Sequence, residues 1–301
     1  LEIDGDAPAG HGVDIFCLMI HIVVRKKVDS SPRVDGQPPK SVCLMKVTSI
    51  QLGRREISKA KMTAHALALV DQASSSDLIL LPEMWPTGFF RFERYPVEAE
   101  PIDGPVVQAF REKAAAIGRH ILMGSFVERK TEGLFNTSLL IDAQGNVSAV
   151  YRKIHLFGYQ SSERDLLTPG TAVVVTDTPW GKAGLATCYD LRFPEQFRKM
   201  VDLGAVFFLV VSAWPAVRLE PWVLFNRVRA MENQAFLISS NCAGVDAGSP
   251  YAGRSMVVDP LGNILAQGGE KECMITVEID IDQVASVRKA FSALHDRVDL
   301  G

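Results

Sequence analysis

From Lys46 onward, short apolar runs alternate with longer amphipathic runs, and this alternation restricts the fold more than any other feature of the sequence. Continuous apolar runs are typical of strands buried on both faces, and the amphipathic runs are typical of helices that cover a sheet. We therefore predict an α/β protein whose sheets are covered by helices. The predicted strands are 47–52, 77–81, 121–128, 136–142, 147–153, 173–176, 182–188, 205–211, 235–241, 255–259 and 274–280, and the predicted helices are 55–74, 105–118, one after Pro194, and 219–233.

Residues 1–44 do not share this pattern. Their one apolar run, Ile15 to Val24, is followed by basic residues, whereas a signal peptide carries its positive charge before such a run. The run is also shorter than the roughly 20 apolar residues of a membrane span. We predict that 1–44 is an N-terminal extension outside the folded domain, with no membrane partner. An interaction arm, or a membrane anchor built on that run, is the alternative.

Charge and cysteine content argue against several functions. The 32 basic and 35 acidic residues give a net charge of −3, without the basic excess that nucleic-acid binding requires. The five cysteines and six histidines are scattered, without the spacing of metal ligands, and no glycine-rich nucleotide motif is present. Dispersed cysteines of odd number are typical of a reducing compartment. We predict a cytoplasmic protein without metal, cofactor or nucleic-acid partner.

Three reactive side chains stand at the ends of different predicted strands: Glu83, Lys153 and Cys188. In α/β sheets, the loops after strands commonly carry functional groups, so we expect these three side chains to share one rim. A thiol that attacks, a carboxylate that takes its proton and a cation that holds oxyanion charge are the groups of a nucleophilic catalyst.

Pro194 is typical of a first helical position, so the Cys188 thiol is predicted to lie on a strand-to-helix turn. The helix dipole and nearby Lys153 are expected to favour a thiolate, and the Tyr189 N–H is placed to donate to an oxyanion. The residues alone leave two alternatives open. A free cysteine is most often a small buried apolar residue, and a Glu83–Lys153 ion pair satisfies both partners without catalysis.

Three segments resemble the signature blocks of the nitrilase superfamily of carbon–nitrogen hydrolases, in the family's order and at plausible separations. They are LLPEMWPTGF (80–89), YRKIHLFG (151–158) and GLATCYDLRFPE (184–195). The resemblance runs from about Met45 to the C-terminus, so 45–301 is predicted to be one carbon–nitrogen hydrolase domain. It implies a four-layer αββα sandwich.

The resemblance also implies roles for individual residues. Family members use a Glu-Lys-Cys triad, which matches Glu83, Lys153 and Cys188. A second family glutamate, thought to position the lysine and the substrate, corresponds to Glu163 in SERDLLTPG, where the alternative is a solvated loop carboxylate. Family members usually assemble, so a homodimer or higher homo-oligomer is predicted, with the segment 287–300 crossing its interface. No metal or cofactor is implied.

The segment that follows the cysteine resembles the amidase branch, and SAWPAVRLEPW (212–222) is more similar to bacterial omega-amidases that hydrolyse 2-oxoglutaramate. We predict hydrolysis of a small ω-amide of a 2-oxo acid through a cysteine thioester. Pro221 replaces the usual His, which leaves the substrate preference open. The alternatives are an N-carbamoyl amino acid amidohydrolase, an aliphatic amidase, and an inactive binding protein on the same fold.

Such a substrate is anionic at one end and needs a cation other than the catalytic lysine. A guanidinium can hold a carboxylate through two hydrogen bonds, so Arg192 or Arg218 is expected to bind it. An ion pair between Arg192 and Glu195, and a rim position for Arg218, are the alternatives. The predicted substrate-binding residues are Tyr189, Arg192, Trp214 and Arg218, with Phe89 as a further wall residue.

Overall fold

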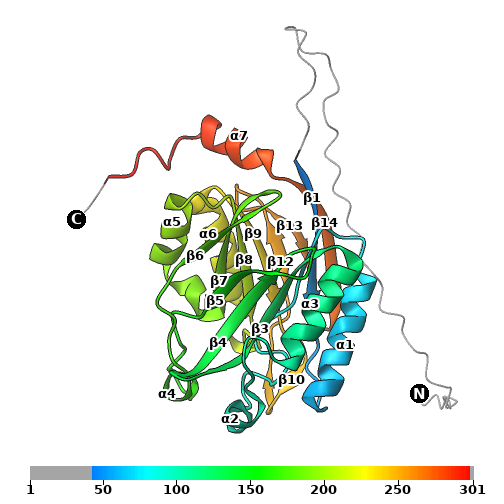
Figure 1. Ribbon diagram of the computed structural model, residues 1–301. Coiled ribbons are helices and arrows are strands. Elements are labelled where there is room, and N and C mark those ends of the chain that lie inside the picture. The colour runs from blue at the N-terminus through cyan, green and yellow to red at the C-terminus, as the bar shows by residue number, and fades with distance from the viewer. Residues whose placement is uncertain (1–42, 299–301) are drawn as a thin grey trace, which may run out of the picture.

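Two mixed six-stranded sheets lie face to face in the computed structural model, which describes residues 43–298 (Figure 1). In spatial order, one sheet contains β14 (Cys273–Asp280), β1 (Leu44–Gln51), β2 (Leu78–Leu80), β3 (His120–Lys130), β4 (Gly133–Ile141) and β5 (Val147–Arg152). The other contains β13 (Ile264–Gln267), β12 (Met256–Val258), β9 (Phe236–Asn241), β8 (Phe207–Ser212), β7 (Gly181–Thr187) and β6 (Val174–Thr178). A small hairpin joins β10 (Val245–Asp246) to β11 (Ser249–Pro250).

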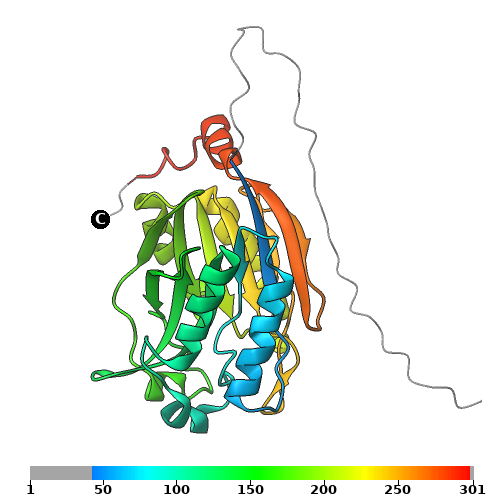
Figure 2. The same ribbon diagram turned by 45° about the vertical axis from the view of Figure 1, so that its right-hand side comes forward.

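Helices cover the outer face of each sheet, as Figures 1 and 2 show. The helices are α1 (Lys59–Gln72), α2 (Tyr95–Glu98), α3 (Pro105–Ile117), α4 (Glu163–Leu166), α5 (Pro194–Asp202), α6 (Leu219–Asn233) and α7 (Asp282–Ala290), with 3₁₀ helices η1 (Phe92–Arg94), η2 (Cys188–Arg192) and η3 (Ala216–Arg218). One apolar core fills the space between the sheets. A second packs α1 and α3 on the first sheet, and a third packs α5 and α6 on the other. The predicted four-layer αββα sandwich is confirmed.

Both sheets have the same arrangement of strand directions. In each, a central parallel trio, β1-β2-β3 or β7-β8-β9, is flanked by antiparallel strands. The ends of the two middle strands meet across the sandwich, where the Glu83 N–H donates to the Ser212 carbonyl at 3.3 Å. The ends of strands from both sheets therefore surround one site.

Every predicted strand and helix forms, with ends that differ by a few residues. The helix predicted from residue 55 begins at Lys59, because Ser58 caps it by accepting from the Lys61 N–H. The short helices α2, α4 and α7 and the strand β13 were not predicted. Leu44 already belongs to β1, whereas 1–42, including the apolar run of the extension, lie outside the described residues. Within 43–298, no helix has the length and apolarity to cross a membrane.

Candidate active site

The loop that carries Glu83 is held in place by β3. Gly124 in that strand has φ +74°, and a Cβ there would come within 2.0 Å of the Pro82 carbonyl oxygen, so a glycine is required for the close approach. The Ser125 N–H donates to the same carbonyl at 3.2 Å, and the Ser125 hydroxyl accepts from the Met84 N–H at 3.0 Å. The backbone is thereby fixed on both sides of Glu83.

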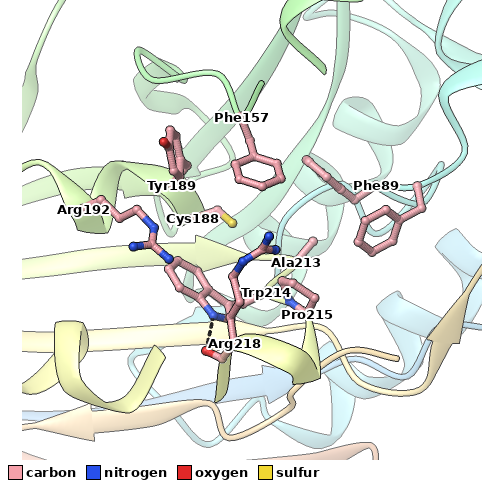
Figure 3. A pocket seen from close by; sticks show the side chains of 10 residues that line it. Phe89, Phe157, Cys188, Tyr189, Arg192, Ala213, Trp214, Pro215 and Arg218 are labelled. Atoms are coloured by element: carbon pink, nitrogen blue, oxygen red, sulfur yellow. Dashed lines mark hydrogen bonds between the residues drawn. The ribbon is translucent and has the colours of Figure 1, made fainter. Parts of the chain in front are cut away.

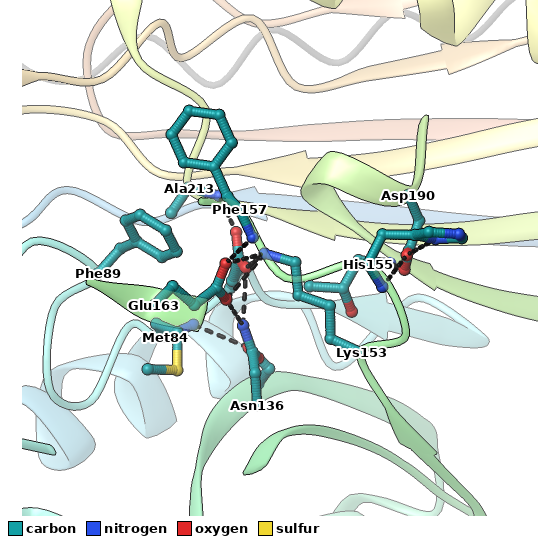
Figure 4. A network of polar contacts seen from close by, with 12 residues as sticks. Met84, Phe89, Asn136, Lys153, His155, Phe157, Glu163, Asp190 and Ala213 are labelled. Carbon is teal, nitrogen blue, oxygen red and sulfur yellow. Dashed lines mark hydrogen bonds and ion pairs between the residues drawn. The ribbon is translucent and has the colours of Figure 1, made fainter. Parts of the chain in front are cut away.

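Glu83, Lys153 and Glu163 form a fully buried charged network (Figure 4). Lys153 Nζ donates to Glu83 Oε1 at 2.9 Å and to both Glu163 carboxylate oxygens at 2.9 and 3.0 Å. Asn136 Nδ2 donates to the same two carboxylates, at 2.8 and 3.1 Å, and the Ala213 N–H donates to Glu83 Oε2 at 2.8 Å. Because buried charges are tolerated only when paired and hydrogen-bonded, each member depends on the others.

Cys188 follows β7 on a strained turn that Asp190 holds. The cysteine has φ +49°, which is costly for a non-glycine residue and is commonly found at functional sites. The buried Asp190 carboxylate accepts from the Thr187 N–H at 2.8 Å, from the Tyr151 hydroxyl at 2.5 Å, and from His155 Nδ1 at 2.7 Å. Since Tyr151 and His155 flank the lysine in the sequence, Asp190 ties the cysteine turn to the end of β5.

The electrostatics of the cysteine differ from the prediction. Burial raises the pKa of the Cys188 thiol, the Glu83 carboxylate raises it further, and Lys153 lowers it by less. Burial lowers the pKa of Lys153, but Glu163 and Glu83 outweigh this effect and raise it above its ordinary value. Both shifts favour the protonated groups, an ammonium and a neutral thiol. The shift of the thiol is opposite to the expected one, because desolvation and Glu83 outweigh the lysine.

A pocket opens directly onto Cys188 (Figure 3). It is lined by Phe89, Phe90, Phe157, Cys188, Tyr189, Arg192, Ala213, Trp214, Pro215 and Arg218. All four predicted substrate-binding residues and Phe89 are therefore at its wall. The Lys153 ammonium lies 5.3 Å from the centroid of the Phe89 ring, so the buried charged network adjoins the same space.

The two arginines of the pocket differ in their surroundings. Arg192 packs its guanidinium against the rings of Trp214 and Phe225, at 5.5 and 5.1 Å from their centroids. The Arg218 side chain points into the pocket in the direction of Cys188, beside the Phe157 ring at 5.2 Å (Figure 3). Neither guanidinium has an ion pair with a carboxylate within 43–298, so the proposed Arg192–Glu195 pair does not form in this structure.

Sequence reasoning missed the groups that hold the charged side chains. Asn136 had a detectable signal, since it is a polar residue inside the buried strand β4. Asp190 had only its place inside the cysteine motif, and the Ala213 N–H had no signal because every residue except proline supplies one. No group of three His, Cys, Asp or Glu side chains suited to a metal ion occurs in the described part of the chain.

A buried thiol, an ammonium and two carboxylates between facing sheets are groups that suit a hydrolase acting on a carbonyl carbon. The family model for carbon–nitrogen hydrolases matches residues 46–289, and the chain belongs to that family. It is a hydrolase of carbon–nitrogen bonds of the amidase type.

The chain is similar to curated 2-oxoglutaramate amidases from two bacteria. It is 32% identical to that of Paenarthrobacter nicotinovorans, with 87% of this chain and 90% of the relative covered. It is 35% identical to that of Bacillus subtilis (strain 168), with 76% and 88% covered. A crystal structure of a family member from Xanthomonas campestris, which carries an arsenic adduct in its active site, matches with a TM-score of 0.80 at 31% identity. That match covers 86% of this chain and 98% of the other.

Proposed function

We propose that Cys188 is the nucleophile, Glu83 the general base and acid, and Lys153 the oxyanion-stabilising cation, with Glu163 positioning Lys153. Attack begins when the Cys188 proton passes to the Glu83 carboxylate and the sulfur bonds to the amide carbon. An ammonium has three hydrogens; because the two Glu163 oxygens can share one of them and Glu83 takes another, the third can turn to the oxyanion. The Tyr189 N–H is proposed as the second donor.

The second half of the reaction returns the site to its starting state. Glu83 gives its proton to the departing nitrogen, ammonia leaves, and a thioester remains on Cys188. Glu83 then takes a proton from water, whose oxygen attacks the thioester carbon and releases the carboxylic acid and the thiol. Because burial and Glu83 raise the pKa of the Cys188 thiol, a base is needed to take its proton at the start of each turnover.

We further propose that the substrate is a small ω-amide of a 2-oxo acid, such as 2-oxoglutaramate. The observation that carries this proposal is the Arg218 guanidinium, which faces the pocket without a carboxylate partner among the described residues. No lining residue is acidic, so nothing there would pair with the ammonium of an amino-acid amide. A 2-oxo group carries no charge, so a 2-oxo acid amide avoids the cost of burying an unpaired ammonium. The names of the two bacterial relatives agree with this substrate.

Ammonia release from a substrate panel tests the proposal. The panel contains 2-oxoglutaramate, glutamine, propionamide and an N-carbamoyl amino acid. We expect kcat/KM for 2-oxoglutaramate to exceed that for glutamine by at least about a hundredfold, the effect of an unpaired buried charge. Preference for the carbamoyl compound would indicate that the enzyme is an N-carbamoyl amino acid amidohydrolase. Preference for propionamide would indicate an aliphatic amidase, and no turnover of any compound would favour an inactive binding protein.

Arg218→Ala is expected to lower kcat/KM for 2-oxoglutaramate by about 30- to 300-fold, mainly through KM, because it removes a charge-assisted bond to the carboxylate. The uncharged propionamide should lose less than about threefold. Arg192→Ala is the matched control, and its effect should be similar for both substrates, because Arg192 packs on Trp214. Steady-state kinetics checks this, and a larger carboxylate-specific loss in Arg192→Ala would reverse the assignment.

Assembly and compartment stay predictions of the sequence. A homodimer is supported by exposed apolar side chains along one helical segment, with Val217, Leu224 and Met231 exposed by 83%, 55% and 52%. Phe291, which follows α7 in the segment predicted to cross the interface, is 67% exposed. Sedimentation of the purified chain tests the homodimer, and fractionation of the source cells tests the cytoplasmic location.

A further inference from the structure

The Ser212 hydroxyl is a buried polar group that the proposed mechanism does not use. Ser212 ends β8 and is fully buried, and its hydroxyl has no hydrogen-bond partner in the described part of the chain. Its backbone carbonyl, in contrast, accepts from the N–H groups of Glu83 and Cys242 at 3.3 and 3.0 Å. An unpaired buried hydroxyl is costly, so its retention next to the site calls for a physical reason.

Strand register places this hydroxyl beside the Cys188 thiol. Thr187, the last residue of β7, pairs with Val211 in the parallel strand β8; Cys188 follows Thr187 and begins η2, and Ser212 follows Val211 and ends β8. Ser212 lies two residues after Val210, so by strand alternation it faces the layer that α5 and α6 cover. Val210 and Cys188 belong to the same core cluster in that layer. The two side chains are therefore neighbours on one face.

The electrostatics of the thiol agree with this placement. Burial is the largest influence on Cys188 and raises its pKa, whereas the Ser212 hydroxyl lowers it, because it is near enough to act as a hydrogen-bond donor to the sulfur although it makes no hydrogen bond of ordinary geometry. A neutral thiol is a weak acceptor and a thiolate is a strong one. A hydroxyl next to the sulfur therefore gains its partner mainly when the charge forms.

We propose that the Ser212 hydroxyl donates a hydrogen bond to Cys188 Sγ as the thiolate forms, and again when the thioester breaks. The inference rests on the proposed role of Cys188 as nucleophile. In the first step the proton moves from Sγ to the Glu83 carboxylate, and the Ser212 O–H bond stays intact while it points at the sulfur. In thioester hydrolysis the sulfur leaves with the bonding electron pair, and the same donor stabilises it until a proton returns.

Alkylation of the thiol tests the inference without any substrate. Ser212→Ala is expected to slow iodoacetamide alkylation of Cys188 by about three- to tenfold between pH 7 and 9, measured by mass spectrometry of the peptide that carries Cys188. Ser212→Thr keeps the hydroxyl and should recover most of the rate. Ser240→Ala is the matched control, because Ser240 is a buried serine on β9 whose hydroxyl already donates to the Ile50 carbonyl at 2.7 Å. The Ser240→Ala variant should be alkylated at the wild-type rate.

Equal alkylation rates for Ser212→Ala and wild type, with unchanged melting temperatures, would overturn the inference, as would an equal slowing in Ser240→Ala. If Ser212→Ala is less stable than wild type, the alkylation rates are compared at a temperature at which both proteins are folded. Slow alkylation of Ser212→Ala in an enzyme that hydrolyses no amide would refute the proposed function and the thioester step, and would leave only the hydrogen bond to the forming thiolate.

Discussion

Cys188→Ala is expected to lower kcat for amide hydrolysis by about a million-fold, because no other group can form the thioester. The substitution shortens a buried side chain at a strained turn and leaves the charged network intact, so the protein should still fold. Ammonia release under single-turnover conditions measures the loss. Mass spectrometry of wild type quenched with substrate should also detect the acyl group on the peptide that carries Cys188.

Two other described cysteines provide the control for this prediction. Cys242 is also buried next to the site, where its thiol donates to the Glu83 carbonyl at 3.4 Å, and Cys273 begins β14. Cys242→Ala and Cys273→Ala are expected to keep activity within about threefold of wild type, since neither thiol has a role in the mechanism. Loss of turnover in either variant, with Cys188→Ala active, would show that the nucleophile is assigned to the wrong residue.

Lys153→Met is expected to have the largest combined effect on stability and activity. Removal of the ammonium leaves two buried carboxylates unpaired, which costs about 3–5 kcal/mol of unfolding free energy. It also removes the oxyanion cation, which we expect to lower kcat by at least about a hundredfold. Chemical denaturation and steady-state kinetics measure the two losses separately.

The stability loss in Lys153→Met should depend on pH with a definite sign. Burial raises the pKa of Glu163, while Lys153 lowers it, so removal of the lysine raises that pKa further. A carboxyl whose folded pKa exceeds its unfolded value contributes stability below the unfolded pKa, and this contribution is lost as the pH rises through the folded pKa. The destabilisation relative to wild type should therefore be larger at pH 8 than at pH 5.

Thermal unfolding at the two pH values checks this dependence. Lys182→Met is the matched control, because Lys182 pairs with Asp177 on the surface at 2.9 Å. An exposed pair contributes about 1 kcal/mol or less, and its loss should show little change between pH 5 and 8. A Lys153→Met variant whose destabilisation does not grow with pH would mean that the buried carboxylates are compensated by other groups.

Local pattern was sufficient to predict the layers and the candidate reactive residues. The period of apolar residues depends only on neighbours along the chain, so strands such as β8 and helices such as α6 could be predicted almost to the residue. Glu83, Lys153 and Cys188 could be found because each stands in a short motif at the end of such a strand. Glu163 was found through its motif alone, since its partners come from other segments.

The sequence by itself therefore determined the αββα layers, the family and the three strand-end side chains. Only the tertiary structure decided the raised pKa of the Cys188 thiol, the inward direction of Arg218, and the position of Ser212 beside Cys188. The physical reason is that a pKa, a free guanidinium and an unpaired hydroxyl depend on desolvation and on partners distant in the sequence. Burial and distances across two sheets set these properties, and both exist only after the layers have packed.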